Sequence, residues 1–133
     1  MKHIKVFENF TSIGTKKLRE FTEGYLAYLL DEDIKIQIEL GSEPDTYELY
    51  IQRFGNGFKW DDVKEHFIPF LKMLIREYDV DDHIRFGMVS YPLNRWLPHE
   101  TYKISEVLND DLSYLTKVSR RIINVSINLK EKV

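Results

Sequence analysis

Four histidines are the side chains best suited to acid–base or metal chemistry near neutral pH, because imidazole titrates in that range. They stand at His3, His66, His83 and His99, with no HExxH pair or other zinc-like spacing. His99 precedes Glu100, and the two could act as a general acid and base. No nucleophile or oxyanion site accompanies them in the sequence. We therefore expect no catalytic residues and a protein that is not an enzyme.

A second group of candidate metal ligands follows a predicted helix. Hard oxygen ligands and one imidazole gather within five residues, at Asp79, Asp81, Asp82 and His83. A calcium loop of the EF-hand type, counted from the first aspartate, needs glycine at its sixth position and glutamate at its twelfth. Ile84 and Ser90 occupy those positions. The chain also lacks cysteine, which excludes thiolate metal sites and disulfides. We expect an acidic turn here, with no metal and no cofactor.

A glycine-containing turn, Gly55-Asn56-Gly57, precedes another predicted helix and could suggest a phosphate-binding loop. The third glycine of the dinucleotide fingerprint is absent, because Trp60 takes its place. The strand before this turn belongs to a predicted hairpin rather than to a parallel βαβ unit. We interpret the turn as a plain connection from strand to helix.

The segment from Tyr91 to Tyr102 is the main candidate for a binding site. It contains two prolines and little periodicity, so we predict a long loop, and long loops are often functional. Several of its residue types are enriched at binding hot spots. We predict that a protein partner contacts Tyr91, Arg95, Trp96, His99 and Tyr102. The alternative, which stays open, is that Trp96 and Leu97 only cap an exposed end of the core.

Basic residues offer an alternative site. Lys117, Arg120 and Arg121 fall at the predicted end of the last helix, where cations complement the helix dipole or could contact phosphate. With Arg85 they form a candidate nucleic-acid-binding set. The chain has 22 acidic and 19 basic residues, and its net charge of −3 argues against a dedicated nucleic-acid binder. A local basic patch is still compatible with that charge.

The elements that must position these residues begin with a hairpin. Apolar and polar residues alternate from Ile34 to Leu40 and again from Tyr47 to Gln52, the pattern of strands with one buried face. The five residues 41–45 between them are mostly polar and include Gly41 and Pro44. We therefore predict two antiparallel strands joined by a short loop.

Apolar spacing predicts helices and strands on both sides of the hairpin. In chain order these are a short strand at 3–7, a helix from a cap at Thr11 or Ser12 to Leu30, a helix from Lys59 or Trp60 to Tyr78 with a bend at Pro69, a strand at 83–91, a helix capped by Ser105 and a final strand at 123–129. The order βαββαβ, followed by a helix and a strand, resembles a ferredoxin-like sandwich. We expect one α+β domain over residues 1–133, an antiparallel sheet with helices packed on one face.

One predicted strand resembles part of the RNA-recognition motif. The residues Arg85-Phe86-Gly87-Met88-Val89-Ser90-Tyr91 place a basic residue before aromatic, small, apolar and aromatic positions. In that family, strand aromatics stack bases on the open face of the sheet. The glycine expected after the basic residue is absent, and Phe86 and Met88 fall on the more apolar side. We interpret the segment as an ordinary core strand.

The opening run MKHIKVFENF, residues 1–10, resembles the start of many small uncharacterised accessory proteins of tailed phages. The run Phe58–Lys64 is similar to segments of such proteins. This resemblance implies a small phage-type accessory protein that acts in the cytoplasm of an infected bacterium. Whether the first ten residues form a strand or a docking tag stays open.

The chain has no apolar run long enough to span a bilayer and no apolar segment typical of a secretory signal. We therefore expect a cytoplasmic protein without membrane association. The hypothesis that best fits these observations is a non-enzymatic binding module that engages a protein partner. Nucleic-acid binding is the alternative, and homo-oligomerisation is compatible with both.

Overall fold

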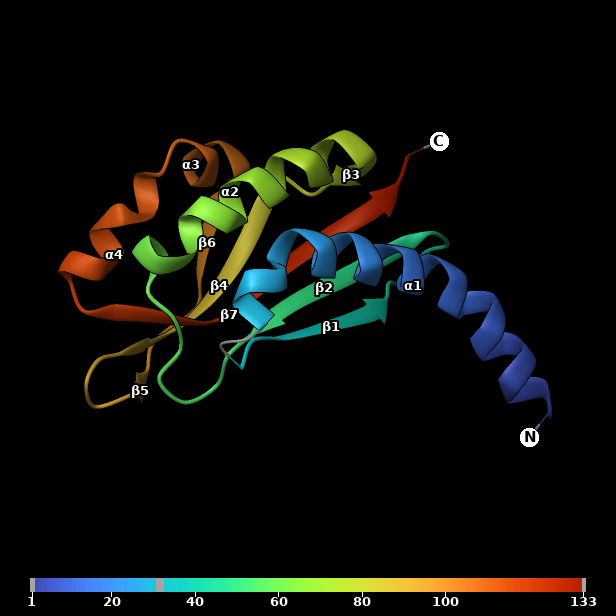
Figure 1. Ribbon diagram of the computed structural model, residues 1–133, viewed down its shortest axis with the longest axis horizontal. Helices are drawn as coiled ribbons and strands as arrows, with labels where there is room; N and C mark the ends of the chain where they lie inside the picture. Colours follow the sequence, from blue (N-terminus) through green and yellow to red (C-terminus); the bar gives the residue numbers. More distant parts are fainter. Residues whose placement is uncertain (1, 31–32, 133) are drawn as a thin grey trace.

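The computed structural model describes residues 2–30 and 33–132, with the side chains of all of these except 2–12 and 30. The described residues form a mixed α/β structure with a seven-stranded antiparallel sheet (Figure 1). In chain order its elements are α1 (Lys2–Leu30), β1 (Lys35–Leu40), β2 (Thr46–Gln52), α2 (Trp60–Glu77), β3 (Tyr78–Val80), β4 (His83–Ser90), β5 (Arg95–Trp96), β6 (Glu100–Lys103), α3 (Ile104–Leu108), the short 3-10 helix η1 (Asp111–Ser113), α4 (Tyr114–Lys117) and β7 (Arg120–Glu131).

The sheet is organised around its last strand. Its order is β1-β2-β7-β4-β5, with β3 also paired to β7 and β6 also paired to β4. Strand β7 therefore lies between β2 and β4, elements that are separated in sequence by the whole of α2. The sheet is therefore complete only when the last strand of the chain has paired at its centre.

The predicted hairpin is confirmed, and the structure supplies its register. Lys35 lies opposite Gln52, and Leu40 lies opposite Tyr47. The Gly41 N–H donates to the Thr46 carbonyl across 2.8 Å and closes the turn. The alternation of apolar side chains decides which face is buried, because a shift of one residue would turn every apolar side chain towards solvent.

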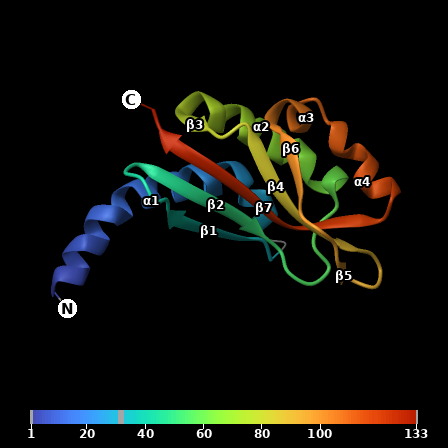
Figure 2. The ribbon, with the colours of Figure 1, turned by 180° about the vertical axis from the view of Figure 1, so that it is seen from behind.

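The two faces of the sheet differ in what covers them. The helices lie on one side, as Figures 1 and 2 show from opposite directions. On the central strand, four buried side chains join the hydrophobic core beneath the helices: Ile122, Val125, Ile127 and Leu129. The residues that alternate with them, Asn124, Ser126 and Asn128, are polar and more accessible. The sheet thus has an apolar covered face and a polar open face.

Helix α1 is longer than predicted, and the strand predicted at 3–7 lies within it. Over five residues, alternation cannot be distinguished from helical spacing, and no proline interrupts the segment from Lys2 to Leu30. The proposed cap at Thr11 or Ser12 is therefore wrong. The buried side of the helix is formed by Leu18, Thr22, Leu26 and Leu29, while Tyr25 is 38% exposed.

Helix α2 starts at Trp60, as predicted, and continues through Pro69. Its buried residues supply much of the core: Trp60, Val63, Phe67, Phe70, Leu71 and Leu74. Each fully buried apolar side chain of this size stabilises the fold by roughly 1.5–3 kcal/mol. Helix α2 is the element against which α1, α3 and η1 pack.

The segment 91–102 is not the loop without regular structure that its prolines suggested. Residues of β5 and β6 pair with β4, with Val89 opposite Trp96 and Phe86 opposite Glu100. The single helix predicted from Ser105 is also wrong, because α3, η1 and α4 are separate short helices. Asp110 has a left-handed backbone conformation, with φ of 60°, and this turns the chain between α3 and η1.

The ferredoxin-like order is not the order observed. Residues 3–7 supply no first strand, and β7 occupies the centre of the sheet. What holds is the coarser prediction of helices combined with an antiparallel sheet. Among the described residues, no helix combines the length and the apolar character needed to cross a bilayer.

Candidate functional site at one end of the sheet

Three side chains from three strands form a row beside Trp96. The register places Trp96 of β5 opposite Val89 of β4, and Val89 opposite Arg121 of β7. Residues opposite each other in an antiparallel pair project from the same face of the sheet. Val89 is only 2% exposed, whereas Trp96 is 69% exposed. The row therefore has a buried aliphatic centre with an accessible indole on one side and a guanidinium on the other.

Two loops bring more apolar side chains to this end of the molecule. The Asn94 side-chain amide donates to Asn56 Oδ1 across 2.7 Å, which joins the 91–94 turn to the 53–57 loop. Figures 1 and 2 show these loops side by side near β5. The side chains exposed on the loops and on β5 define what we call the loop-end surface: Phe54, Tyr91, Leu93 and Trp96.

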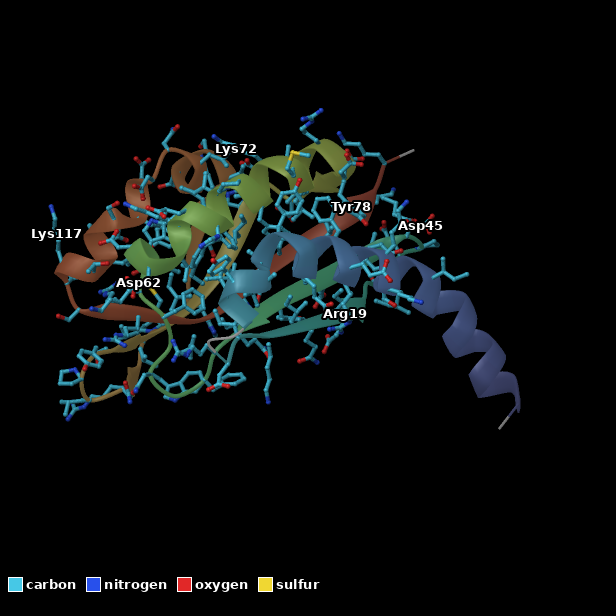
Figure 3. All side chains as sticks on the ribbon, in the orientation of Figure 1. Arg19, Asp45, Asp62, Lys72, Tyr78 and Lys117 are labelled. Atoms are coloured by element: carbon cyan, nitrogen blue, oxygen red, sulfur yellow. The ribbon has the colours of Figure 1, made fainter. Side chains whose placement is uncertain are left out.

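A basic cleft adjoins the loop-end surface. It has a volume of about 260 Å³, and its lining includes the cations Arg53, Lys59 and Arg121 together with one carboxylate, Asp62. Among the residues that the structure describes, none of these three cations forms a salt bridge. In Figure 3, Asp62 marks the start of α2 at this end. Local positive charge therefore exceeds negative charge here, although the whole chain is acidic.

Arg121 connects the cleft to the loop-end surface. Its guanidinium carbon lies 3.8 Å from the centre of the Tyr91 ring, which is the geometry of a cation–π contact. The Tyr91 N–H donates to the Ser119 carbonyl across 2.9 Å and holds the turn against the start of β7. Lys59, Tyr91 and Arg121 also line a smaller hollow of about 140 Å³. The basic and aromatic groups thus form one continuous region.

Gly57 allows the 53–59 loop to lie directly against β7. Its φ of +64° is a conformation that side chains rarely adopt, and an added Cβ would lie 2.5 Å from the Ile122 carbonyl oxygen. The next residue, Phe58, exchanges two backbone hydrogen bonds with Ile122, of 2.8 and 2.9 Å. A glycine is therefore required where the loop is joined to the central strand.

The start of α2 is held by a second set of contacts. Trp60 Nε1 donates to Asp110 Oδ1 across 2.6 Å, and Lys64 Nζ donates to Asp110 Oδ2 across 3.0 Å. Burial alone would raise the pKa of Asp110, but hydrogen bonds from Trp60, Lys64 and Ser113 outweigh it and lower the pKa. These contacts fix the first turn of α2 and, with it, the adjacent Lys59.

Tyr102 does not belong to an exposed contact surface, because it is a buried residue of β6 that belongs to the hydrophobic core. Its hydroxyl donates to Glu100 and is 2.6 Å from the Tyr114 hydroxyl. Burial and these hydrogen bonds raise the pKa of Tyr102. The hydrogen bond from Tyr102 and the contact with Arg120, at 2.6 Å, lower the pKa of Glu100. This network stabilises the fold.

His99 lies on the open face of the sheet, above Gly87. A Cβ on that glycine would be 3.3 Å from His99 Nε2, so the missing side chain provides the space that the imidazole occupies. Arg85 is also exposed on this face, where it lies opposite Ser126. Phe86 and Met88, the positions compared with the RNA-recognition motif, are fully buried. They cannot stack bases.

The structure therefore regroups the predicted site residues. Tyr91, Arg95 and Trp96 lie at one end of the sheet together with Arg121, whereas His99 and Tyr102 lie elsewhere. Lys117 is exposed at the end of α4, as Figure 3 shows, and Arg120 is engaged by Glu100. Sequence reasoning missed Phe54, Leu93, Arg53 and Lys59. An aromatic residue beside a glycine-containing turn, as at Phe54, was the available signal.

One aspartate of the acidic turn lies near His83. His83 Nδ1 lies 4.0 Å from Asp81 Oδ1, and no cluster of three or more metal-binding side chains is present among the described residues. Comparison of the chain with protein-family models, curated proteins and solved structures finds no match.

Proposed function

We propose that the protein is a non-enzymatic binding module that docks a protein partner through the loop-end surface. The observation that carries the proposal is the exposure of its side chains, from 43% for Tyr91 to 70% for Leu93, on loops that are hydrogen-bonded to each other. Exposed apolar patches with polar rims mark interaction sites. Aromatic anchors supply most of the binding energy at such sites.

The charge around the surface indicates the chemistry of the partner. Arg95 is on the same strand as Trp96, and Arg53 and Arg121 lie on the adjoining cleft. A partner that places an apolar side chain against Trp96 and carboxylates beside it would complement both features. The contact set in this proposal keeps Tyr91, Arg95 and Trp96 and adds Phe54 and Leu93.

The resemblance to phage accessory proteins supplies the proposed setting, the cytoplasm of an infected bacterium. The first ten residues are the main source of that resemblance, and their side chains lie outside the described residues. The binding proposal does not depend on them, since every contact residue lies between residues 53 and 121.

Nucleic-acid binding is a second candidate, favoured by one observation. Trp96 and Arg121 share a row across the sheet, and aromatic stacking beside a cation is how single strands are bound without base readout. The rest of the predicted basic set contributes less, because Arg85 lies four residues away along β4 and Arg120 is paired. A steep fall of affinity with salt would distinguish this mode.

The test compares the wild-type chain with Trp96→Ala and with a control, Ile13→Ala, which removes an equally exposed apolar side chain outside the surface. Each chain is used to capture partners from native lysate treated with nuclease, and the captured polypeptide is then purified and titrated. We expect Trp96→Ala to weaken binding by about 1–3 kcal/mol. The control should bind as the wild type does.

Tryptophan fluorescence gives a direct readout of the same event. The chain has two tryptophans, of which Trp60 is 1% exposed and Trp96 is 69% exposed, so acrylamide should quench mainly Trp96. Partner binding should protect that emission. Equal affinity of Trp96→Ala and wild type would refute the proposed anchor, and capture that disappears with nuclease would favour the nucleic-acid alternative.

A further inference from the structure

Strand β1 is an edge of the sheet. In the described part of the chain it pairs with β2 only, and Figures 1 and 2 show no element running along its outer side. The Gly41 N–H donates to the Thr46 carbonyl, so the residues of β1 that are hydrogen-bonded to β2 are the odd-numbered ones, from 35 to 39. The backbone groups of Ile36, Ile38 and Leu40 therefore point outward, away from β2.

One contact confirms this orientation. Arg19 Nη1 donates to the Ile36 carbonyl oxygen across 2.9 Å from α1, which requires that oxygen to be accessible from outside the hairpin. A carbonyl oxygen has two lone pairs and can accept a second hydrogen bond. The edge thus retains the capacity to pair with another strand at Ile36 and Ile38.

The sequence of this edge is complementary to itself. In an antiparallel pair of two β1 strands centred on Gln37, Lys35 lies opposite Glu39 twice. Ile36 lies opposite Ile38 in the same register, and the outward backbone groups of these two residues face each other. On the open face, Lys35, Gln37 and Glu39 are all exposed, and on the covered face Leu40 is 49% exposed.

The two neighbouring registers form less favourable pairs of side chains across the strands. Pairing centred on Ile38 sets Glu39 opposite Gln37 and leaves Lys35 opposite Gly41. Pairing centred on Ile36 sets Glu39 opposite Asp33, which brings two carboxylates together. Opposite charges across strands stabilise a pair and like charges destabilise it. Only the register centred on Gln37 therefore matches charge, apolar side chains and backbone groups together.

We infer that β1 is a homodimerisation strand, which pairs antiparallel with β1 of a second copy about a two-fold axis at Gln37. The two sheets then form one continuous sheet, and the same patch is used by both copies, as a two-fold interface requires. Because β1 has only six residues, the interface is small and the dimer is weak and concentration-dependent.

Dimerisation would have a consequence for binding. Trp96 is on β5, at the opposite edge of the sheet from β1. The loop-end surfaces of the two copies would both stay accessible, and a partner with two binding sites would gain avidity. The inference itself does not rest on the proposed function, since no residue of the loop-end surface takes part in strand pairing.

Sedimentation velocity of the full chain, from micromolar to millimolar concentration, tests the inference. The wild type should show a monomer–dimer equilibrium. Lys35→Glu places like charges opposite each other twice and should weaken the dimer by roughly tenfold or more, as should Glu39→Lys. The double variant Lys35→Glu/Glu39→Lys restores both pairs and should recover the wild-type equilibrium. Lys72→Glu, on α2, makes the same change of net charge and should have no effect.

A backbone variant separates strand pairing from surface charge. Ile38→Pro removes an N–H that points outward, while the β1–β2 hydrogen bonds use odd-numbered residues. It should abolish the dimer and preserve the circular dichroism spectrum. Trp96→Ala should leave the dimer unchanged. A monomer at all concentrations, or failure of the charge swap to restore association, would overturn the inference, even if the partner-binding proposal holds.

Discussion

Asp110 joins the first turn of α2 to the turn between α3 and η1, and replacing it by alanine should destabilise the whole fold. Its carboxylate accepts hydrogen bonds from Trp60 Nε1, Lys64 Nζ and Ser113 Oγ, at 2.6, 3.0 and 2.9 Å. Trp60 is 1% exposed, so its indole N–H is left without this partner in a buried position if Asp110 is truncated.

Two effects set the magnitude for Asp110→Ala. A buried donor left without a partner costs about 1–3 kcal/mol. Asp110 has a φ of 60°, and holding alanine in that left-handed conformation costs about 1 kcal/mol more. The ion pair with Lys64 is partly accessible to solvent and adds little. We expect a loss of about 3 kcal/mol of unfolding free energy, which for a chain of this size lowers Tm by about 12 °C.

Urea and thermal denaturation measure this loss, with Asp110→Asn as the matched control. Asparagine tolerates the left-handed conformation and keeps an oxygen for Trp60, so the control should lose only about 1 kcal/mol. In a Trp60→Phe background no indole N–H is left without a partner, and Asp110→Ala should cost less there. Equal losses in the two backgrounds would refute the role assigned to the Trp60 hydrogen bond.

The pH dependence follows from the lowered pKa of Asp110. Its folded pKa lies below the unfolded value of about 3.9, so the ionised carboxylate contributes stability above that pH. The contribution is lost as pH falls through the folded pKa. The difference in stability between wild type and Asp110→Asn should therefore be constant near neutrality and shrink in acid below about pH 4.

Two further predictions concern Gly57 and Glu100. Gly57→Ala should lose roughly 2 kcal/mol or more, because its Cβ would meet the Ile122 carbonyl at 2.5 Å as well as strain the backbone. The control Gly55→Ala has a positive φ but nothing within 4 Å, and urea denaturation should show a loss of only about 1 kcal/mol. Glu100→Gln should weaken the network with Tyr102 and Arg120. Because hydrogen bonding lowers the pKa of Glu100, the difference from wild type should be largest above about pH 4.3 and decline below it, and an unchanged acid limb in the variant would contradict this.

The parts of the fold that could be predicted are those with long, regular patterns. The hairpin of β1 and β2, the start of α2 and the strand β4 all follow from alternation or helical spacing over six or more residues. The strand predicted at 3–7 failed because its window was too short to separate the two periodicities. The prediction of a single helix after Ser105 was wrong because Asp110 has a left-handed backbone conformation, which the residue type alone does not predict.

The candidate site could also be predicted only in part. Residue types alone identified Trp96 as a potential anchor, and the structure shows its side chain exposed. Tyr102 has the same residue type as Tyr91, yet it is buried, because it lies opposite Ile84 on the covered face of β4. The face on which a strand residue lies depends on its register with a distant strand, and that register cannot be read from local sequence.

The amino-acid sequence by itself determined the hairpin strands, the start of α2 and the strand β4, together with the side of each that is apolar, because these depend on the spacing of neighbouring residues. Only the tertiary structure decided that β7 lies at the centre of the sheet and that Arg121 and Trp96 lie on either side of Val89 in one row. Those contacts join residues far apart in the chain, and they form when burial of all the apolar sides together selects one arrangement of the strands.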